Sequence, residues 1–133
     1  MVSTLRRDPA VKWVMFDCAC AATGVVTALR TAGIDGVTIG GEAPLTTQIQ
    51  EMKGGSPQAW AALSLPILGF GLIDALARHF NGDSMQPVLD QRFPWQIVTN
   101  DNVHSVVLDG ADNYVGLASY GDAFSGLWHV GRD

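Results

Sequence analysis

Four short apolar runs recur along this chain, and each one ends in a polar or glycine-rich cluster. They occupy residues 11–16, 36–39, 59–63 and 95–98. The first three lead into stretches with the apolar spacing of helices, so strands alternate with helices. Such alternation is typical of parallel sheets, which bind ligands outside the carboxyl ends of their strands. The sequence therefore predicts an α/β fold, with a parallel sheet of about four strands and helices on both faces.

The composition predicts a single globular domain spanning residues 1–133. Hydrophobic residues make up 47% of the chain and charged residues 16%, which excludes a disordered chain. This apolar content is high for so small a domain and indicates surface that is buried against something else. Thirteen Asp and Glu outnumber eight Lys and Arg. Nucleic acid is not an expected partner, because neutralising phosphates needs a concentrated basic face.

Neither a membrane span nor a signal peptide is expected in this chain. No apolar run reaches the roughly 20 residues of a membrane-spanning helix. The basic pair Arg6-Arg7 is not followed by the apolar core of a signal peptide. The chain as written is therefore expected to stay in the cytoplasm, unless it is a piece of a longer precursor.

Helical spacing of apolar residues predicts four helices. They cover residues 21–32, 44–53, 66–81 and 120–128. Residues 83–93 read as a polar crossover that contains proline. Residues 103–108 fit either a further strand or the start of a helix, and residues 109–117 read as a loop broken by glycines.

Cys18 and Cys20 form a C-x-C pair at the first predicted strand-to-helix turn. A zinc site needs four ligands at wider spacing, and no further Cys or His lies nearby in the sequence. A disulfide between extended residues two apart would be strained, because their Cβ vectors diverge. We therefore expect ordinary small cysteines here and no metal.

The remaining polar groups form no recognisable catalytic set. Gly40-Gly41 is not followed by a phosphate-binding pattern such as G-x-G-x-x-G, so a plain turn is expected there. The chain shows no Ser/His/Asp arrangement, no paired acids at a matched spacing and no nucleotide motif. We therefore expect no cofactor and no catalysis. The histidines are scattered and read as surface or capping residues: His79, His104 and His129.

Three stretches, in this order, share a pattern with a known family. Residues 14–32 contain A-T-G-V-V-T-A-L, which fits "A-x-G-x-x-x-A-L" after a strand and a ligand turn. Residues 60–82 contain G-F-G-L-I-D-A-L-A-R, which fits a "G-x-x-x-x-D-x-L-x-R" helix. Residues 94–103 read P-W-Q-I-V-T-N-D-N-V, which fits a late strand ending in "V-T-x-D-N". This order resembles the C-terminal lobe of type I, ribose-binding-like periplasmic sugar-binding proteins of ABC transporters.

Two positions depart from that family at the expected ligand site. The family usually presents Asn-Asp at the first turn, where this chain has Cys18 and Ala19, with Asp17 displaced by one. The family often has Gln at the third strand end, where this chain has Ser64 and Leu65. A larger departure is length, because family members have two lobes and the whole N-terminal lobe is lacking here.

The resemblance implies a sugar site built from carboxylates and amides, often with a stacked indole. Trp60 or Trp95 would supply the indole, although Trp60 also reads as a core residue. Asp17 fits a helix N-cap equally well, and residues 100–102 fit a turn that closes a strand. The candidate ligand-binding residues are Asp17, Cys18, Glu42, Ser64, Asn100 and Asn102.

The function implied by the resemblance is non-catalytic binding of a sugar or polyol in ABC-type import. If the chain is part of a longer protein, the N-terminal lobe and a transporter permease are expected partners, and the location is periplasmic or extracytoplasmic. An alternative is an interaction or regulatory domain of the same architecture that has lost its ligand. A small α/β enzyme that uses Asp17 or Cys18 is a third interpretation.

Self-association is also expected. The family's opening βα units, which would flank the strand at residues 11–16, are absent, so apolar groups around Trp13, Met15 and Val25 would face water. A homodimer would cover them, either by pairing of edge strands or by exchange of the helix at residues 120–128.

Overall fold

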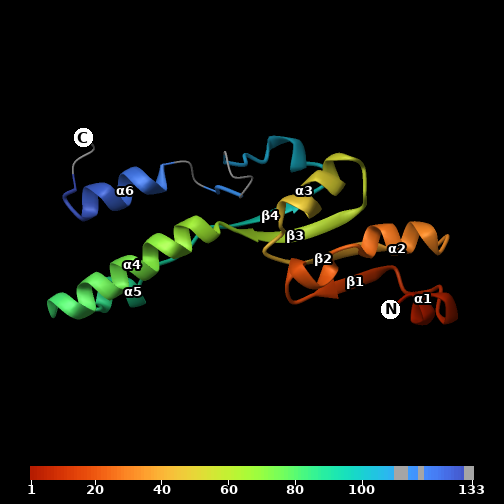
Figure 1. Cartoon of the computed structure of the whole chain (residues 1–133), viewed down its shortest axis with the longest axis horizontal. Coiled ribbons are helices and arrows are strands. Elements are labelled where there is room, and N and C mark those ends of the chain that lie inside the picture. The colour runs from red at the N-terminus through yellow and green to blue at the C-terminus, as the bar shows by residue number, and fades with distance from the viewer. Residues whose placement is uncertain (110–113, 117–118, 131–133) are drawn as a thin grey trace.

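The computed structural model describes residues 1–109, 114–116 and 119–130, and it confirms the α/β class. Figure 1 shows a sheet with helices α1 to α3 beside it and a helical arm, α4 to α6, extending from it. Part of the predicted loop at residues 109–117 lies outside the described residues. In chain order the elements are α1 Val2–Arg7, β1 Trp13–Phe16, the 3₁₀ turn η1 Ala19–Ala22, α2 Val25–Thr31, β2 Thr38–Glu42, α3 Thr46–Lys53, β3 Gln58–Leu63, α4 Leu65–Asn81, α5 Gln86–Leu89, β4 Trp95–Thr99, η2 Val103–Ser105 and α6 Tyr120–Leu127.

The four strands lie side by side in the order β1-β2-β3-β4. The first three are parallel, as predicted, but β4 is antiparallel to β3, with Leu63 beside Trp95 and Ala59 beside Thr99. The reason is the path of α4, which runs away from the sheet. The chain then returns along residues 82–94 to the end of β3 at which α4 left, and an antiparallel neighbour needs no crossover over the sheet.

Strand β2 continues through Gly40 and Gly41, where the sequence predicted a plain turn. A Cβ atom at Gly40 would lie 2.5 Å from the carbonyl oxygen of Ala59, and one at Gly41 would overlap the carbonyl of Phe16. Both positions therefore need glycine so that the neighbouring backbones can approach closely.

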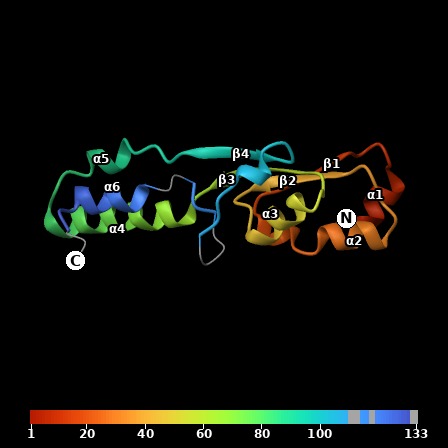
Figure 2. The ribbon, with the colours of Figure 1, turned by 90° about the horizontal axis from the view of Figure 1, so that it is seen from above.

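Helices α2 and α3 cover the same face of the sheet, as Figure 2 shows. The connections β1–α2–β2 and β2–α3–β3 advance in the same direction across the sheet, and right-handed crossovers that do so place their helices on one side. The sheet therefore departs from the expected pattern of helices on both faces. Large side chains on the other face, including Trp13 and Ile97, are exposed.

The main core lies between the sheet and these two helices. Strand residues Ile39, Trp60 and Val98 meet Ile49 and Met52 of α3, and all five are almost fully buried. Trp60, 1% exposed, is a core residue, and its indole N–H donates a 2.7 Å hydrogen bond to Oε1 of Gln58. It is therefore not available as a stacking platform for a ligand.

The arm has its own packing. Phe70 of α4 lies against Tyr120 and Phe124 of α6, and its ring stacks on that of Trp128 with centroids 5.6 Å apart. The helix predicted at residues 120–128 is confirmed as α6, and the one predicted at 66–81 as α4. Segment 21–32 is instead divided into η1 and α2, because Gly24 takes a left-handed conformation between them.

Candidate functional site

The carboxyl ends of β1, β2 and β3 lie at one edge of the sheet, and two carboxylates are placed there. Asp17 follows the last residue of β1, and Glu42 is the last residue of β2. Both are exposed, and their strands are neighbours, with Phe16 paired to Gly41. Trp95, at the start of the antiparallel strand, reaches this same edge and is exposed. Two acids and an indole therefore share the edge at which the parallel strands end.

Ser64 and Cys18 also lie at this edge, but the side chains of both accept hydrogen bonds from the protein's own backbone. The Ser64 side chain is buried, and its Oγ accepts the backbone N–H of Ile67 at 3.4 Å as the N-cap of α4. Cys18 is the N-cap of η1, where its Sγ accepts the backbone N–H of Cys20 at 3.2 Å. Asp17 is therefore not the N-cap of η1, and it is exposed.

Asn100 and Asn102 lie at the opposite edge, because β4 is antiparallel and its last residue, Thr99, pairs with Ala59 near the start of β3. Oδ1 of Asn100 accepts the N–H of Gln58 at 3.1 Å, and its Nδ2 donates to the carbonyl of Ser56 at 2.9 Å. Asn102 bonds to the backbone of its own turn, accepting from Thr99 and donating to Ile97, both at 2.9 Å. The six candidates thus do not form one site: Asn102 closes its own turn, and Asn100 ties that turn to the loop before β3.

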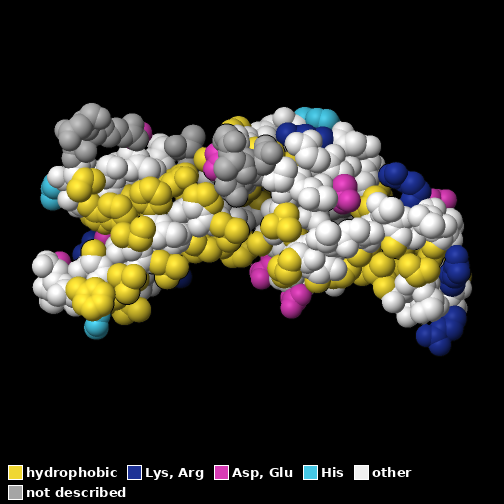
Figure 3. Space-filling view, in the orientation of Figure 1, with side chains coloured by type: hydrophobic (Ala, Val, Ile, Leu, Met, Phe, Trp, Pro, Cys, Tyr) yellow, Lys and Arg dark blue, Asp and Glu magenta, His cyan; other side chains and the backbone are white. Residues whose placement is uncertain are grey.

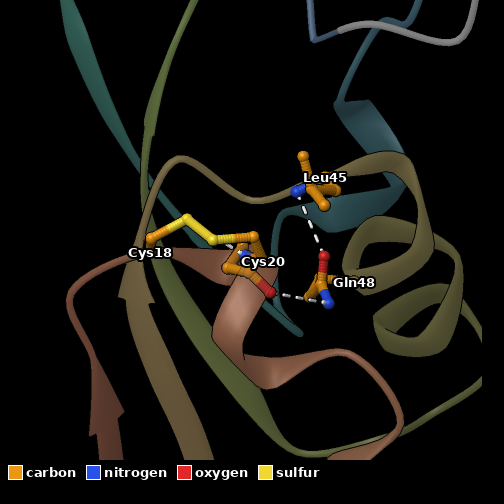
Figure 4. The surroundings of a disulfide bond; sticks show 5 residues. Cys18, Cys20, Leu45 and Gln48 are labelled. Carbon is orange, nitrogen blue, oxygen red and sulfur yellow. Dashed lines mark hydrogen bonds between the residues drawn. A yellow bond between two sulfur atoms is a disulfide. The ribbon is translucent and has the colours of Figure 1, made fainter.

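The two cysteines form a disulfide, which corrects the expectation of ordinary thiols. The divergence of Cβ vectors that argued against it holds for extended chain, whereas η1 begins at Ala19 and turns the backbone at once. Their Cα atoms are 5.3 Å apart, a separation that a disulfide spans. Figure 4 shows this bond beside the start of α3.

A buried amide ties the first two strand-end loops together. Oε1 of Gln48 accepts the N–H of Leu45 at 3.1 Å, and Nε2 donates to the carbonyl of Ala19 at 3.4 Å. Figure 4 shows both bonds from the one side chain. Gln48 is 1% exposed, so it fixes the loop after β1 against the loop after β2. This side chain was not among the predicted site residues.

A hollow of about 190 Å³ opens at the same edge, between the loop after β2 and the start of α4. Thr46 and Thr47 bring hydroxyl groups to its wall, and Leu63 and Leu65 bring apolar surface. The other described lining residues are Ala43, Pro44, Leu45, Pro66 and Tyr114.

Tyr114 comes from farther along the chain than the other described lining residues. Its hydroxyl donates a 2.6 Å hydrogen bond to Oε1 of Gln96, and burial raises the pKa of this phenol. The two threonines begin the helix after a predicted strand end, a position that the sequence alone could have indicated. Tyr114 carried no such signal, because its contact is non-local.

Two features are absent from the part of the chain that the structure describes. No group of three or more His, Cys, Asp or Glu side chains there is arranged to hold a metal ion. Within the same residues, no helix combines the length and apolar character that crossing a membrane requires.

Comparison of the chain with protein-family models, curated proteins and solved structures finds no match. Its function is therefore inferred from its own residues and their geometry.

Proposed function

We propose that the chain binds a small sugar or polyol at the carboxyl edge of its three parallel strands, without catalysis. One observation carries the proposal: Asp17, Glu42 and the exposed Trp95 share an edge with a hollow of about 190 Å³. Carboxylates accept paired hydroxyl hydrogen bonds, and an indole face packs on the apolar face of a sugar ring. Thr46 and Thr47 add hydroxyl groups at the wall of the hollow.

The setting that fits this proposal is one lobe of a binding protein in ABC-type import. The hollow is open, so a ligand would be held from one side, and an N-terminal lobe would close over it. A disulfide is typical of oxidising compartments such as the periplasm, and the Cys18–Cys20 bond supports that location. A transporter permease would be a partner if the lobe belongs to a longer protein.

Titration calorimetry against pentoses, hexoses and polyols tests the proposal. Weak binding of at least one of them is expected, and Asp17→Asn or Glu42→Gln should weaken it at least several-fold. Asp101→Asn is the matched control, because this exposed acid lies at the opposite edge of the sheet. No heat with any of these ligands, or an equal loss in the control, would contradict the proposal.

An interaction domain that has lost its ligand is the second candidate. The observation that favours it is the exposed apolar face of the sheet, which bears Trp13, Met15 and Ile97. Exposed apolar patches of this kind mark contact surfaces. Under this proposal no sugar would shift the thermal unfolding temperature, whereas a partner that covers the face would raise it.

A further inference from the structure

The sheet has one face that no described helix covers, here called the open sheet face. Its outer strands carry Trp13 and Met15 on β1, and Trp95 and Ile97 on β4, each more than half exposed. The two central strands carry the small residues Gly40, Ala59 and Ala61 between them, and the β2 partner of Ala61 is the exposed Glu42, the last residue of its strand.

The strand register shows that these residues share one face. Met15 pairs with Gly40, and Gly40 pairs with Ala59. Ala61, two residues further along β3, pairs with Ile97. Paired residues and residues two apart point to the same side of a sheet. Glu42, the β2 partner of Ala61, lies on this face as well, at its carboxyl end. Large apolar side chains therefore flank a centre of small residues that ends at Glu42, and the small residues let another element approach the backbone closely.

The arm carries a second unpartnered apolar surface, here called the α4 stripe. It consists of Leu65, Leu72, Ile73, Leu76 and Phe80, which are between 54 and 83% exposed. Their spacing places them along one side of the helix. Figure 3 shows hydrophobic side chains running along this arm toward its free end.

The other side of α4 is already occupied. Phe70 contacts the aromatic rings of α6, and Asp74 accepts hydrogen bonds from Arg78 and Trp128. These two charged residues are the only Asp, Glu, Lys or Arg in α4, and they pair with each other on that side. The α4 stripe is therefore an apolar surface free of Asp, Glu, Lys and Arg.

The α4 stripe cannot cover the open sheet face of its own chain. Ser64 alone separates the end of β3 from the start of α4, which leaves no loop in which the chain could turn back. Figures 1 and 2 both show α4 running away from the sheet. A 17-residue helix is about 25 Å long, whereas the six residues of β3 span about 20 Å along the strand. The helix is long enough to run the length of the face along the central strands.

We propose that two copies of this chain form a two-fold symmetric dimer in which each α4 stripe packs on the partner's open sheet face. Such an interface is isologous, so both contacts form together and both surfaces are covered in each copy. The small residues of β2 and β3 would receive the helix, and the large residues of β1 and β4 would lie on either side of it.

The available area fits a stable dimer. The two surfaces together contain nine large apolar side chains that are more than half exposed. Covering roughly 100 Å² of each would bury about 900 Å² per chain. A specific interface of standard size buries about 800 Å² per partner. This dimer does not need a solute at the carboxyl edge. It fits the second candidate function, an interaction domain, and a second copy of the chain is then the partner.

Sedimentation equilibrium at micromolar concentration tests the proposal. The wild-type chain should have twice its monomer mass of 14.2 kDa. Ile97→Lys on the open sheet face and Leu76→Glu on the α4 stripe should each yield a monomer with an unchanged circular dichroism spectrum. Val107→Lys and Leu89→Glu are the matched controls, because these side chains are as exposed but lie outside both surfaces. They should remain dimeric.

Mixing the two monomeric variants separates this dimer from other arrangements. In the mixture, the intact stripe of the Ile97→Lys chain meets the intact face of the Leu76→Glu chain, and Lys faces Glu in the other contact. A heterodimer should therefore form, with a dissociation constant at least tenfold below that of either variant alone. A monomeric wild type, a dimer that survives Ile97→Lys, or a mixture that stays monomeric would each overturn the proposal. Mass is the readout throughout, so the result is independent of sugar binding.

Discussion

Trp128 donates its indole N–H to Oδ1 of Asp74 at 2.9 Å and thereby fastens the end of α6 to α4. The other carboxylate oxygen of Asp74 accepts the guanidinium of Arg78, also at 2.9 Å. The Trp128 ring stacks on Phe70 at the same time. One side chain thus joins the two long helices of the arm by both a polar and an aromatic contact.

Trp128→Phe should therefore destabilise the arm while keeping an aromatic ring against Phe70. The variant loses a hydrogen bond to a charged, buried acceptor, which contributes about 1.5–3 kcal/mol. Urea unfolding should report a loss in that range. Tyr120→Phe keeps its ring contact with Phe70 and should change the unfolding free energy by less than about 0.5 kcal/mol. A loss in Trp128→Phe no larger than that in Tyr120→Phe would show that the hydrogen bond to Asp74 contributes little.

The acid side of the stability profile should depend on Asp74. Burial acts to raise the pKa of Asp74, but the hydrogen bonds from Arg78 and Trp128, together with the charge of Arg78, outweigh it and hold the pKa below its ordinary value. This stabilisation is fully present above the unfolded-state pKa of about 3.9. It is lost as the pH falls through the lower folded-state pKa.

Unfolding free energies at pH 6 and at pH 2.5 provide the measurement. The wild-type chain should lose more stability between these pH values than Asp74→Asn, which has no carboxylate to protonate at this position. A variant with the same acid sensitivity as the wild type would show that other groups control the profile.

Gln48 should matter more to stability than its exposed neighbour on the same helix. Gln48→Leu keeps the volume but leaves the N–H of Leu45 and the carbonyl of Ala19 without the amide that bonds them. Leaving the buried carbonyl of Ala19 unsatisfied costs about 1–3 kcal/mol, so a loss in that range is expected in urea unfolding. Gln50→Leu, on the exposed side of α3, should be close to neutral. Similar losses in both would mean that the two bonds contribute little.

The disulfide predicts a simple thiol count. Thiol titration of the denatured chain should find no free thiol before reduction and two afterwards, because the chain contains only Cys18 and Cys20. The loop that the bond closes is very short, so the bond restricts the unfolded chain only slightly. Removing the bond should therefore lower the free energy of unfolding by no more than about 1.5 kcal/mol. The double variant Cys18→Ser/Cys20→Ser should therefore stay folded. Two free thiols in the untreated protein would contradict the bond.

Local patterns were enough to predict most elements of this fold. Strands β3 and β4 lie within a residue of the apolar runs at 59–63 and 95–98. Helices α4 and α6 agree as closely, because the apolar spacing that predicted them is a local signal. The direction of β4 was not predictable in this way. It depends on the path of α4 after it leaves the sheet, which is set by tertiary packing and not by the local sequence.

The same limit explains the candidate site. Asp17 and Glu42 were placed correctly at the carboxyl edge, because both follow parallel strands. Asn100 was placed at the wrong edge, since reversing β4 carries its end to the other side of the sheet. Gln48 and Tyr114 act through partners 29 and 18 residues away, and no spacing rule connects such pairs.

Ser64 gives the arm a mechanical property. With one residue between β3 and α4, the helix has no flexible joint, so a tilt of α4 must turn the end of the central strand as well. Leu65, the first residue of α4, lies at this junction and belongs both to the α4 stripe and to the wall of the hollow. Any partner that covers Leu65 also becomes part of the rim of the hollow, and one that covers the open sheet face meets Trp95 at the carboxyl edge, so a bound partner and access to that edge are linked through these two side chains.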